Sequence, residues 1–341
     1  MTEQPPIQPT PVGALRFNID NLRLEYFNGS EYVNITTDSP ETNTGGTRGI
    51  IAGGRSNGSG RNYIQFANAD TTGNFSDFGD LTSTRRVPIV ISSRTLGHIC
   101  GGYVSDYTAN CDRVTFASTG NAVDSGIDLT AAKYNGGGTG NATRGLYIGG
   151  NAGGSVVNVI EYMTLASTAN FVDFGDLIQV TNSNGAVSSP VRSVTLGGSA
   201  PGGRINNIQY VTISTTGNAA DFGDLLGTRT PNAGASSNAI RGIVMGGAAP
   251  GPVASNSNTI EFITIATLGN GQDFGDLTSS RGDGAGFSSP TRSVCAMGSG
   301  SSDTVVEYVQ IMSAGNALDF GDLNQGTYEI GGNSNGHGGL G

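Results

Sequence analysis

The sequence lacks tryptophan altogether and has one lysine, Lys133, and two histidines among 341 residues. It has no run of about eighteen or more apolar residues, so a membrane-spanning helix is not expected. The first residues, MTEQPPIQPTP, lack the positively charged start and apolar stretch of a secretory signal peptide. We therefore expect the protein to be made and to fold in a cytosol.

The scarcity of cysteine and histidine excludes several kinds of site. Three cysteines are too few for a disulfide framework. Cys100 and Cys111 are candidates to face each other across neighbouring strands, but cytosolic thiols stay reduced, which argues against a bond between them. His98 and His337 lie far apart in the sequence, with no spacing that suits zinc and no partners for a catalytic triad. We therefore predict no enzyme activity, no metal and no cofactor.

Charge is also scarce, and it is mostly of one sign. Charged residues make up 13% of the chain, with 27 acidic against 17 basic side chains and a net charge of -10. Such a surface repels phosphate backbones and anionic membranes, so neither a nucleic-acid partner nor membrane insertion is expected. The 56 glycines and the short clusters of Ile, Val, Leu and Phe instead favour an ordered, turn-rich, all-β chain.

The chain is rich in repetition. The pentapeptide DFGDL recurs at intervals of 46 to 52 residues if the imperfect copy DSGIDL is included, and its copies begin at Asp77, Asp124, Asp173, Asp221, Asp273 and Asp319. A protein kinase carries a single DFG, whose aspartate holds one magnesium ion, so repetition excludes that interpretation. A fixed period of a few tens of residues indicates a repeat architecture.

A second landmark keeps the same period. An arginine opens an apolar run that ends in a glycine pair in five of six cases, as in RGIIAGG and RGLYIGG; these arginines are Arg48, Arg94, Arg144, Arg192, Arg241 and Arg292. A run such as IEYMTLAST follows, and a Gly-Asn or Ala-Asn turn then leads into DFGDL. Many runs are apolar at consecutive positions, which predicts sheets that are covered on both faces.

Six such units predict a six-bladed β-propeller with four-stranded blades. A stacked solenoid is the alternative, but it needs distinct caps at both ends. The first unit begins at Arg48 without a first strand, while the tail at 333–336 repeats the NSNG of 182–185. We therefore predict that the C-terminal tail closes the first blade, and we divide the chain into an extended Pro-rich arm at 1–12, a β-meander at 13–45 and a propeller at 46–341.

The repeated residues are interpreted as structural, because every unit has them. Phe78, its counterparts and the leucines of DFGDL are expected to fill the gaps between blades, while the glycine allows a close approach of the backbone. The aspartates are predicted to cap turns or to pair with the arginine of each unit; they are Asp77, Asp80, Asp173, Asp176, Asp221, Asp224, Asp273, Asp276, Asp319 and Asp322. A calcium site is the alternative, although one aspartate pair offers few oxygens.

The N-terminal segment differs in character from the repeats. Three alternating runs in GALRFNIDNLRLEYFNGSEYVNIT predict a β-meander, with a hairpin turn at Asn28-Gly29. So short a sheet buries too little surface to be stable alone, so we expect it to pack on the propeller, on copies of itself or on another protein. The candidate docking residues are Arg16, Phe17, Tyr26, Phe27 and Tyr32.

Two resemblances add to this interpretation. The glycine pairs and the aromatic in the following strand resemble kelch-type propellers, although the tryptophan usual in kelch repeats is absent here. The DFGDL form resembles propeller-like proteins of tailed bacteriophages. The N-terminal segment resembles a β-meander of phage tail fibres and appendages, at Gly13, Arg16, Phe17, Asn18, Leu24, Tyr26, Asn28, Gly29 and Tyr32.

The resemblance implies a non-enzymatic structural protein of a virion, assembled in the host cytoplasm and present in multiple symmetric copies. Its expected partners are capsid, neck or tail proteins, which the N-terminal segment would contact. The alternative is a protein that binds a glycan or receptor on the host surface, for which Tyr103 and Tyr107 are the candidate aromatic contacts.

Overall fold

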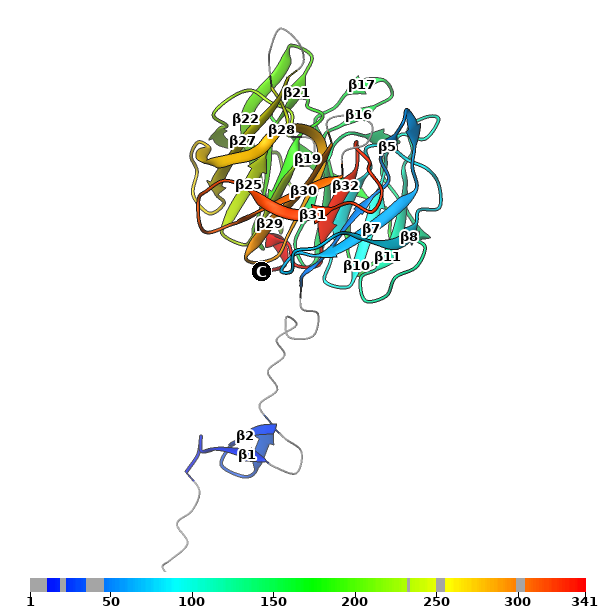
Figure 1. The fold of residues 1–341 in the computed structure, drawn as a ribbon. Helices are drawn as coiled ribbons and strands as arrows, with labels where there is room; N and C mark the ends of the chain where they lie inside the picture. Colours follow the sequence, from blue (N-terminus) through cyan, green and yellow to red (C-terminus); the bar gives the residue numbers. More distant parts are fainter. Residues whose placement is uncertain (1–10, 19–22, 35–45, 232–233, 250–254, 299–303) are drawn as a thin grey trace, which may run out of the picture. The chain divides into compact units, whose positions relative to one another are not determined.

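The computed structural model describes residues 11–18, 23–34, 46–231, 234–249, 255–298 and 304–341, within two units, Met1–Asn43 and Thr44–Gly341 (Figure 1). The prediction of an all-β protein is confirmed, because the described elements are antiparallel strands apart from one 3-10 helix, η1 (Gly338–Leu340). The described residues contain no helix with the length and hydrophobicity needed to span a bilayer. Most of the predicted arm, residues 1–10, lies outside the described residues.

The N-terminal unit is a three-stranded sheet in the order β1 (Leu15–Asn18), β2 (Arg23–Phe27) and β3 (Tyr32–Asn34). The predicted turn joins β2 to β3, where the Asn28 side chain accepts hydrogen bonds from the backbone N–H groups of Ser30 and Glu31. Gly29 has a φ of +106°, which glycine adopts without a steric penalty. The sequence signal for this hairpin was therefore correct.

The larger unit contains six repeat sheets, which we number 1 to 6. Sheet 1 has the order β32 (Gly331–Ser334), β4 (Arg48–Ala52), β7 (Tyr63–Asn68), β8 (Ser76–Asp80). Sheet 2 consists of β9 (Ile89–Ser92), β10 (Leu96–Cys100), β11 (Asn110–Thr115), β12 (Val123–Asp128). Sheet 3 consists of β14 (Gly137–Gly140), β15 (Arg144–Ile148), β18 (Val159–Thr164), β19 (Val172–Asp176). Sheet 4 consists of β20 (Gly185–Ser188), β21 (Arg192–Ala200), β22 (Gly203–Thr212), β23 (Ala220–Asp224).

Sheets 5 and 6 are continuous through one long strand, β28 (Gln272–Ser288), which ends sheet 5 and begins sheet 6. The remaining strands of these two sheets are β24 (Ala235–Ser237), β25 (Arg241–Met245), β27 (Ser255–Thr264), β29 (Arg292–Gly298), β30 (Val305–Gln310), β31 (Leu318–Asp322). The segments that connect the main strands contain short two-residue strands: β5 (Arg55–Ser56), β6 (Ser59–Gly60), β13 (Lys133–Tyr134), β16 (Asn151–Ala152), β17 (Ser155–Val156), β26 (Ala248–Ala249).

The two ends of the larger unit meet in sheet 1. β32 pairs with β4, with Gly331 opposite Ala52 and Ser334 opposite Gly49, and the red β32 lies among the blue strands in Figure 1. The prediction that the tail supplies the missing strand is therefore confirmed. The first strands of the sheets also contact one another in a cycle, in the order β9, β14, β20, β24, β28, β32 and back to β9.

The core lies between neighbouring sheets. One cluster joins Ile50 and Phe78 of sheet 1 to Ile99 and Phe116 of sheet 2. Another cluster joins sheet 6 to sheet 1 through residues such as Phe287. Because both faces of a sheet are covered in this way, consecutive apolar residues are buried, as the sequence pattern predicted.

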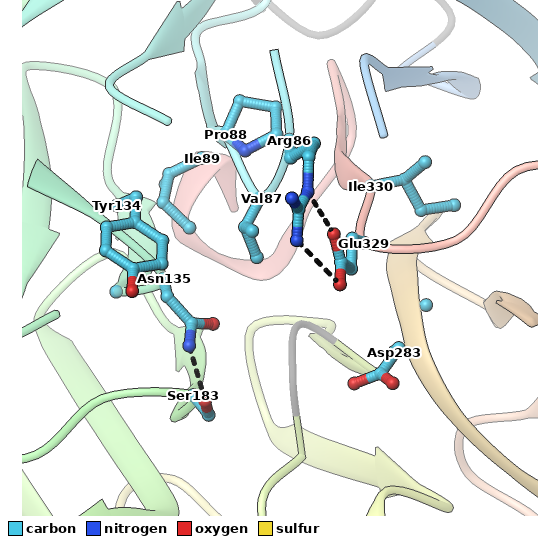
Figure 2. Close-up of a pocket in the computed structure, with 12 residues that line it drawn as sticks. Arg86, Val87, Pro88, Ile89, Tyr134, Asn135, Ser183, Asp283, Glu329 and Ile330 are labelled. Carbon is cyan, nitrogen blue, oxygen red and sulfur yellow. Dashed lines mark hydrogen bonds and ion pairs between the residues drawn. The ribbon is translucent and has the colours of Figure 1, made fainter. Parts of the chain in front are cut away.

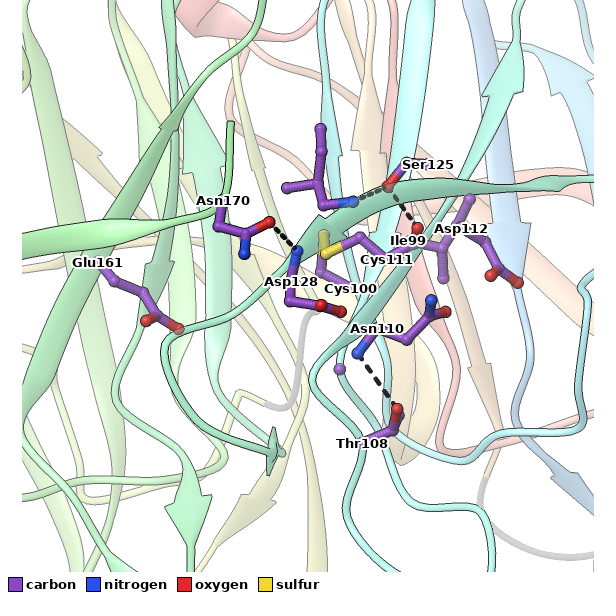
Figure 3. The surroundings of a disulfide bond; sticks show 12 residues. Ile99, Cys100, Thr108, Asn110, Cys111, Asp112, Ser125, Asp128, Glu161 and Asn170 are labelled. Atoms are coloured by element: carbon purple, nitrogen blue, oxygen red, sulfur yellow. Dashed lines mark hydrogen bonds between the residues drawn. A yellow bond between two sulfur atoms is a disulfide. The ribbon is translucent and has the colours of Figure 1, made fainter. Parts of the chain in front are cut away.

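A disulfide joins Cys100 of β10 to Cys111 of β11, which are paired directly across the two strands (Figure 3). The expected cytosolic compartment argues against this bond, and the structure corrects that expectation. Strand register brings the two buried side chains together, and the bond closes the loop 101–110 at its base. The remaining cysteine, Cys295, is free and buried, and burial raises the pKa of its thiol.

Candidate functional site

DFGDL forms the outer edge of each repeat sheet and binds the next sheet. The backbone N–H of the motif's last aspartate donates to the side-chain oxygen of the turn asparagine in the following sheet, at 3.0 to 3.1 Å; the pairs are Asp80–Asn121, Asp128–Asn170, Asp176–Asn218, Asp224–Asn270, Asp276–Asn316 and Asp322–Asn74. The last pair joins sheet 6 to sheet 1. In all six repeats the backbone of the motif's last aspartate therefore binds the next sheet, whereas the prediction assigned the aspartates a role through their side chains.

The glycine of the motif is required by the same contact. Gly223 has a φ of +148°, and a Cβ atom at this position would lie 2.5 Å from the carbonyl oxygen of Gly269 in the next sheet. Real Cβ atoms do not approach backbone atoms so closely, because the steric repulsion is too large. The preceding Phe222 and the following Leu225 are buried in the cluster between sheets 4 and 5.

We expect Gly223→Ala to lower the free energy of unfolding by about 2 to 5 kcal/mol, from backbone strain together with overpacking. Gly227→Ala is the matched control, because Gly227 has open space around its Cβ position and an ordinary φ. This control should be neutral or slightly stabilising, as at other compatible sites. Urea unfolding of both variants checks the expectation, and equal stability of the two would contradict it.

Among the ion pairs of the described residues, none joins a repeated arginine to a DFGDL aspartate, contrary to the predicted clasp. Five guanidinium groups lie over an aromatic ring of the third strand of their own sheet, 4.5 to 4.8 Å from its centroid; the pairs are Arg48–Phe66, Arg144–Tyr162, Arg192–Tyr210, Arg241–Phe262 and Arg292–Tyr308. Each also donates to a backbone carbonyl of the next sheet, at Phe116, Ile213, Ile265, Ile311 and Ala69, respectively. These arginines therefore bind neighbouring sheets together.

Sheet 2 departs from this pattern. Arg113 and Ser125 replace the aromatic ring and the DFGDL phenylalanine of the other sheets. The arginine of this sheet, Arg94, instead donates to the carbonyl oxygens of Leu340 and Gly341. In this sheet the repeated arginine therefore holds the C-terminus.

Buried ion pairs join the sheets at positions that the sequence analysis missed. A cation eight or nine residues after the first aspartate of one motif contacts a carboxylate on the third strand of the next sheet; the pairs are Arg85–Asp112, Lys133–Glu161, Arg229–Glu261 and Arg281–Glu307. The Arg85 and Lys133 contacts measure 3.1 and 3.0 Å, with all four side chains fully buried. Each carboxylate also accepts the N–H of a residue just after the preceding motif, such as Thr82 or Thr130.

The two remaining sheets carry neutral side chains at the same two positions. Gln209 and Gln65 stand where the other sheets have the carboxylate, and Thr181 and Thr327 stand where the cation would be. All four side chains are buried. Gln209 accepts a hydrogen bond from the N–H of Ile178, as the carboxylates do. Cation and anion are thus present together or absent together, because either one alone would leave an uncompensated buried charge. This matched exchange along the repeats is the sequence signal that would have found the pairs.

A cavity of about 230 Å³ opens where the loops before the first strands converge; we call it the central cavity (Figure 2). Arg86 donates from Nε and Nη2 to the two carboxylate oxygens of Glu329, at 2.7 and 3.3 Å, and this hydrogen bonding raises the pKa of the Arg86 guanidinium. Asn135 donates to the Ser183 hydroxyl at 2.7 Å. Tyr134 forms part of the wall, and burial raises the pKa of its hydroxyl.

The backbone around the central cavity is held in an uncommon conformation. Val87, Asn135, Ser183, Asp283 and Glu329 all have φ between +48° and +62°. Their N–H groups donate around the opening: Glu329 to the Asp283 carbonyl, Val87 to Glu329, Asn135 to Val87 and Ser183 to Asn135. Each such non-glycine residue costs about 1 to 3 kcal/mol and persists only where its surroundings fix it, as happens at ligand sites.

The chemistry of the central cavity suits reversible binding of a polar ligand. Its described walls offer carboxylates, an amide, a hydroxyl and a tyrosine, with no histidine, cysteine or lysine among them. Both histidines lie elsewhere, and burial lowers the pKa of His98 and of His337 to about 4, so they are neutral near pH 7. Among the residues that the structure describes, no group of three or more His, Cys, Asp or Glu side chains could hold a metal ion.

The predicted docking residues fall on opposite faces of the N-terminal sheet. Arg16 forms an ion pair with Glu25 at 2.8 Å and lies 3.7 Å from the centroid of the Tyr32 ring, which contacts Phe27. These residues therefore hold the sheet together. Phe17 and Tyr26 lie on the other face with Leu15 and are exposed.

No protein-family model matches the chain, and a comparison with curated proteins finds no match.

Proposed function

We propose that the six repeat sheets are the blades of a closed β-propeller. The first strands contact one another in a cycle, and the asparagine hydrogen bonds join each sheet to the next, including sheet 6 to sheet 1. The arginine of sheet 6, Arg292, likewise reaches the Ala69 carbonyl of sheet 1. A stacked solenoid would leave its two terminal repeats without such a contact.

We further propose that the protein is a non-enzymatic structural component of a tailed-phage virion, docked by its N-terminal unit and displaying the propeller in several symmetric copies. The observation that carries this proposal is the exposed apolar face of the N-terminal sheet, formed by Leu15, Phe17 and Tyr26. Exposed apolar side chains on so small a sheet favour burial against a partner protein.

Two further features support display on a particle. The repeated arginines and the DFGDL motifs are used in contacts between sheets, which is the role expected of a robust scaffold. The disulfide between Cys100 and Cys111 suits the oxidising surroundings outside a cell, where virion surfaces are found. The expected partners are capsid, neck or tail proteins, met during assembly in the host cytoplasm.

Incorporation into particles tests the docking role. We expect the double variant Phe17→Ala/Tyr26→Ala to lower the amount of this protein in purified particles at least about tenfold. This corresponds to a loss of about 1.4 kcal/mol or more in the free energy of binding to the particle. Leu318→Ala is the matched control, because Leu318 is as exposed as Phe17, at 57%, but lies in the propeller. Full occupancy of the double variant would show that the docking assignment is wrong.

A further inference from the structure

Sheet 2 is unusual in the loop that joins its second and third strands. In sheets 1, 3, 4 and 5 the corresponding connection continues as extra antiparallel pairing, as in β5 with β6 and β16 with β17. In sheet 2 the loop 101–110 has only a single antiparallel bridge, between Tyr103 and Tyr107, and the disulfide between Cys100 and Cys111 closes its base. The bond holds this one loop in place covalently.

Three tyrosines gather beside the central cavity, and we call them the tyrosine cluster. The rings of Tyr107 and Tyr134 stack with their centroids 4.8 Å apart, and Tyr103 lies about 6 Å from both. All three side chains are half-buried, so the cluster is supported on one side and open on another. Tyr134 also lines the central cavity, as does Arg86, whose guanidinium lies 5.5 Å from the centroid of the Tyr103 ring.

We propose that the tyrosine cluster and the central cavity form one binding site for an uncharged saccharide. A pyranose ring presents a flat C–H face that packs on aromatic side chains, while its hydroxyl groups need hydrogen-bond partners around the edge. The cavity wall supplies such partners in the carboxylates of Glu329 and Asp283 and in the amide of Asn135. No other described part of the chain combines stacked aromatic rings with a polar cavity.

Charge and size narrow the class of ligand. Glu329 is engaged by Arg86 and lies 3.7 Å from Arg55, while Asp283 in the cavity wall and Asp106 beside Tyr107 add two further carboxylates, so acidic side chains outnumber basic ones around the site. Such a site in a chain of net charge -10 gives no attraction for a polyanionic glycan. At about 230 Å³ the cavity is also smaller than the roughly 300 to 1,000 Å³ of drug-sized sites, so it suits one sugar unit while the next lies over the tyrosines.

The site is already organised without a ligand. The disulfide fixes the base of the tyrosine loop, and the hydrogen bonds between Val87, Asn135 and Ser183 fix the cavity wall. Fixing these groups in advance reduces the ordering cost of binding. The site lies within Thr44–Gly341, so it adds a function that is independent of docking by the N-terminal unit.

Titration of the full-length protein with neutral sugars tests the proposal. The probes are glucose, galactose, mannose, N-acetylglucosamine and their short oligomers, with glucuronic acid as the anionic comparison, followed by calorimetry and by tyrosine emission. We expect at least one neutral sugar to bind with a Kd below about 10 mM and more tightly than glucuronic acid. Absence of neutral-sugar binding, or preference for the acid, would overturn the proposal.

Three variants locate the site. Tyr134→Ala should weaken binding at least about tenfold. Asp283→Asn should weaken it at least about threefold while keeping a residue that tolerates positive φ, so it remains informative if the first variant misfolds. Leu318→Ala is the control and should bind normally, since Leu318 is exposed and belongs neither to the central cavity nor to the tyrosine cluster. Unchanged affinity in Asp283→Asn and in folded Tyr134→Ala would place any sugar binding elsewhere and reject this site.

Discussion

Glu261→Gln alone is expected to lower the free energy of unfolding by about 3 to 5 kcal/mol, because Arg229 then remains buried without its counter-charge. Arg229 also donates to the carbonyl oxygens of Gly246 and Thr259, which fix the guanidinium in place. Burial lowers the pKa of Arg229 to about 10. Because a guanidinium is effectively always protonated in proteins, we expect the variant to keep this buried charge at pH 7. Urea unfolding at pH 7 measures the loss.

The chain itself supplies the control for this variant. Sheet 4 carries Gln209 with Thr181 where sheet 5 carries Glu261 with Arg229. The double variant Arg229→Thr/Glu261→Gln copies this neutral arrangement, so we expect it to recover all but about 1 kcal/mol of the wild-type stability, as other buried ion pairs replaced as a pair do. Additive losses in the double variant would show that the two charges are not coupled, contrary to the expectation.

The period of the sequence was enough to predict the strands and their number in each repeat. Apolar runs opened by Arg48 or Arg144 became second strands, and the Asn28-Gly29 signal became a turn. The tail strand was predictable because the NSNG at 333–336 repeats an earlier segment in a known place. These features depend on local patterns, which a sequence displays directly.

Contacts between sheets were less predictable, because they depend on distances in space. Six repeated arginines and six terminal aspartates of DFGDL match in number, which predicts that they pair, yet Arg48 donates to the Phe116 carbonyl of the next sheet. The actual ion pairs, such as Arg85 with Asp112, join residues of different repeats. A match in the number of arginines and aspartates therefore did not reveal the ion-pair partners. The partners are revealed by the repeats in which the cation and the carboxylate are both replaced by neutral residues.

The central cavity was not predictable for a similar reason. Its walls come from five separate segments of the chain, so no continuous motif marks it. The sequence marks Tyr103 and Tyr107 as candidate aromatic contacts, but Tyr134 belongs to β13 and joins them only in the folded chain. The sequence placed Cys100 and Cys111 on neighbouring strands, but the expected cytosolic compartment argued against a bond, and only the strand register shows that the two side chains meet.

Deleting residues 329–341 is expected to abolish cooperative folding, with a loss larger than the roughly 5 to 15 kcal/mol of stability typical of a native protein. The deletion removes β32, which pairs with β4 and contacts the first strands of sheets 2 and 6. The edge of β4 and the apolar cluster around Ile51 and Phe287 then lose their cover. Circular dichroism during urea titration and size-exclusion chromatography measure the outcome.

Deleting only residues 337–341 separates closure of the circle from loss of the C-terminal turn. This shorter deletion keeps β32 and removes η1, with the buried side chains of His337 and Leu340 and the carbonyl oxygens that Arg94 contacts. We therefore expect the free energy of unfolding to fall by about 3 to 6 kcal/mol, with folding still cooperative. In an open stack of repeats, removing a terminal strand would cost only the contacts of the last repeat and leave the others folded. If the protein without residues 329–341 is still monomeric and unfolds cooperatively, the closed propeller is contradicted. Closure requires that the longer deletion abolishes folding and that the shorter deletion does not.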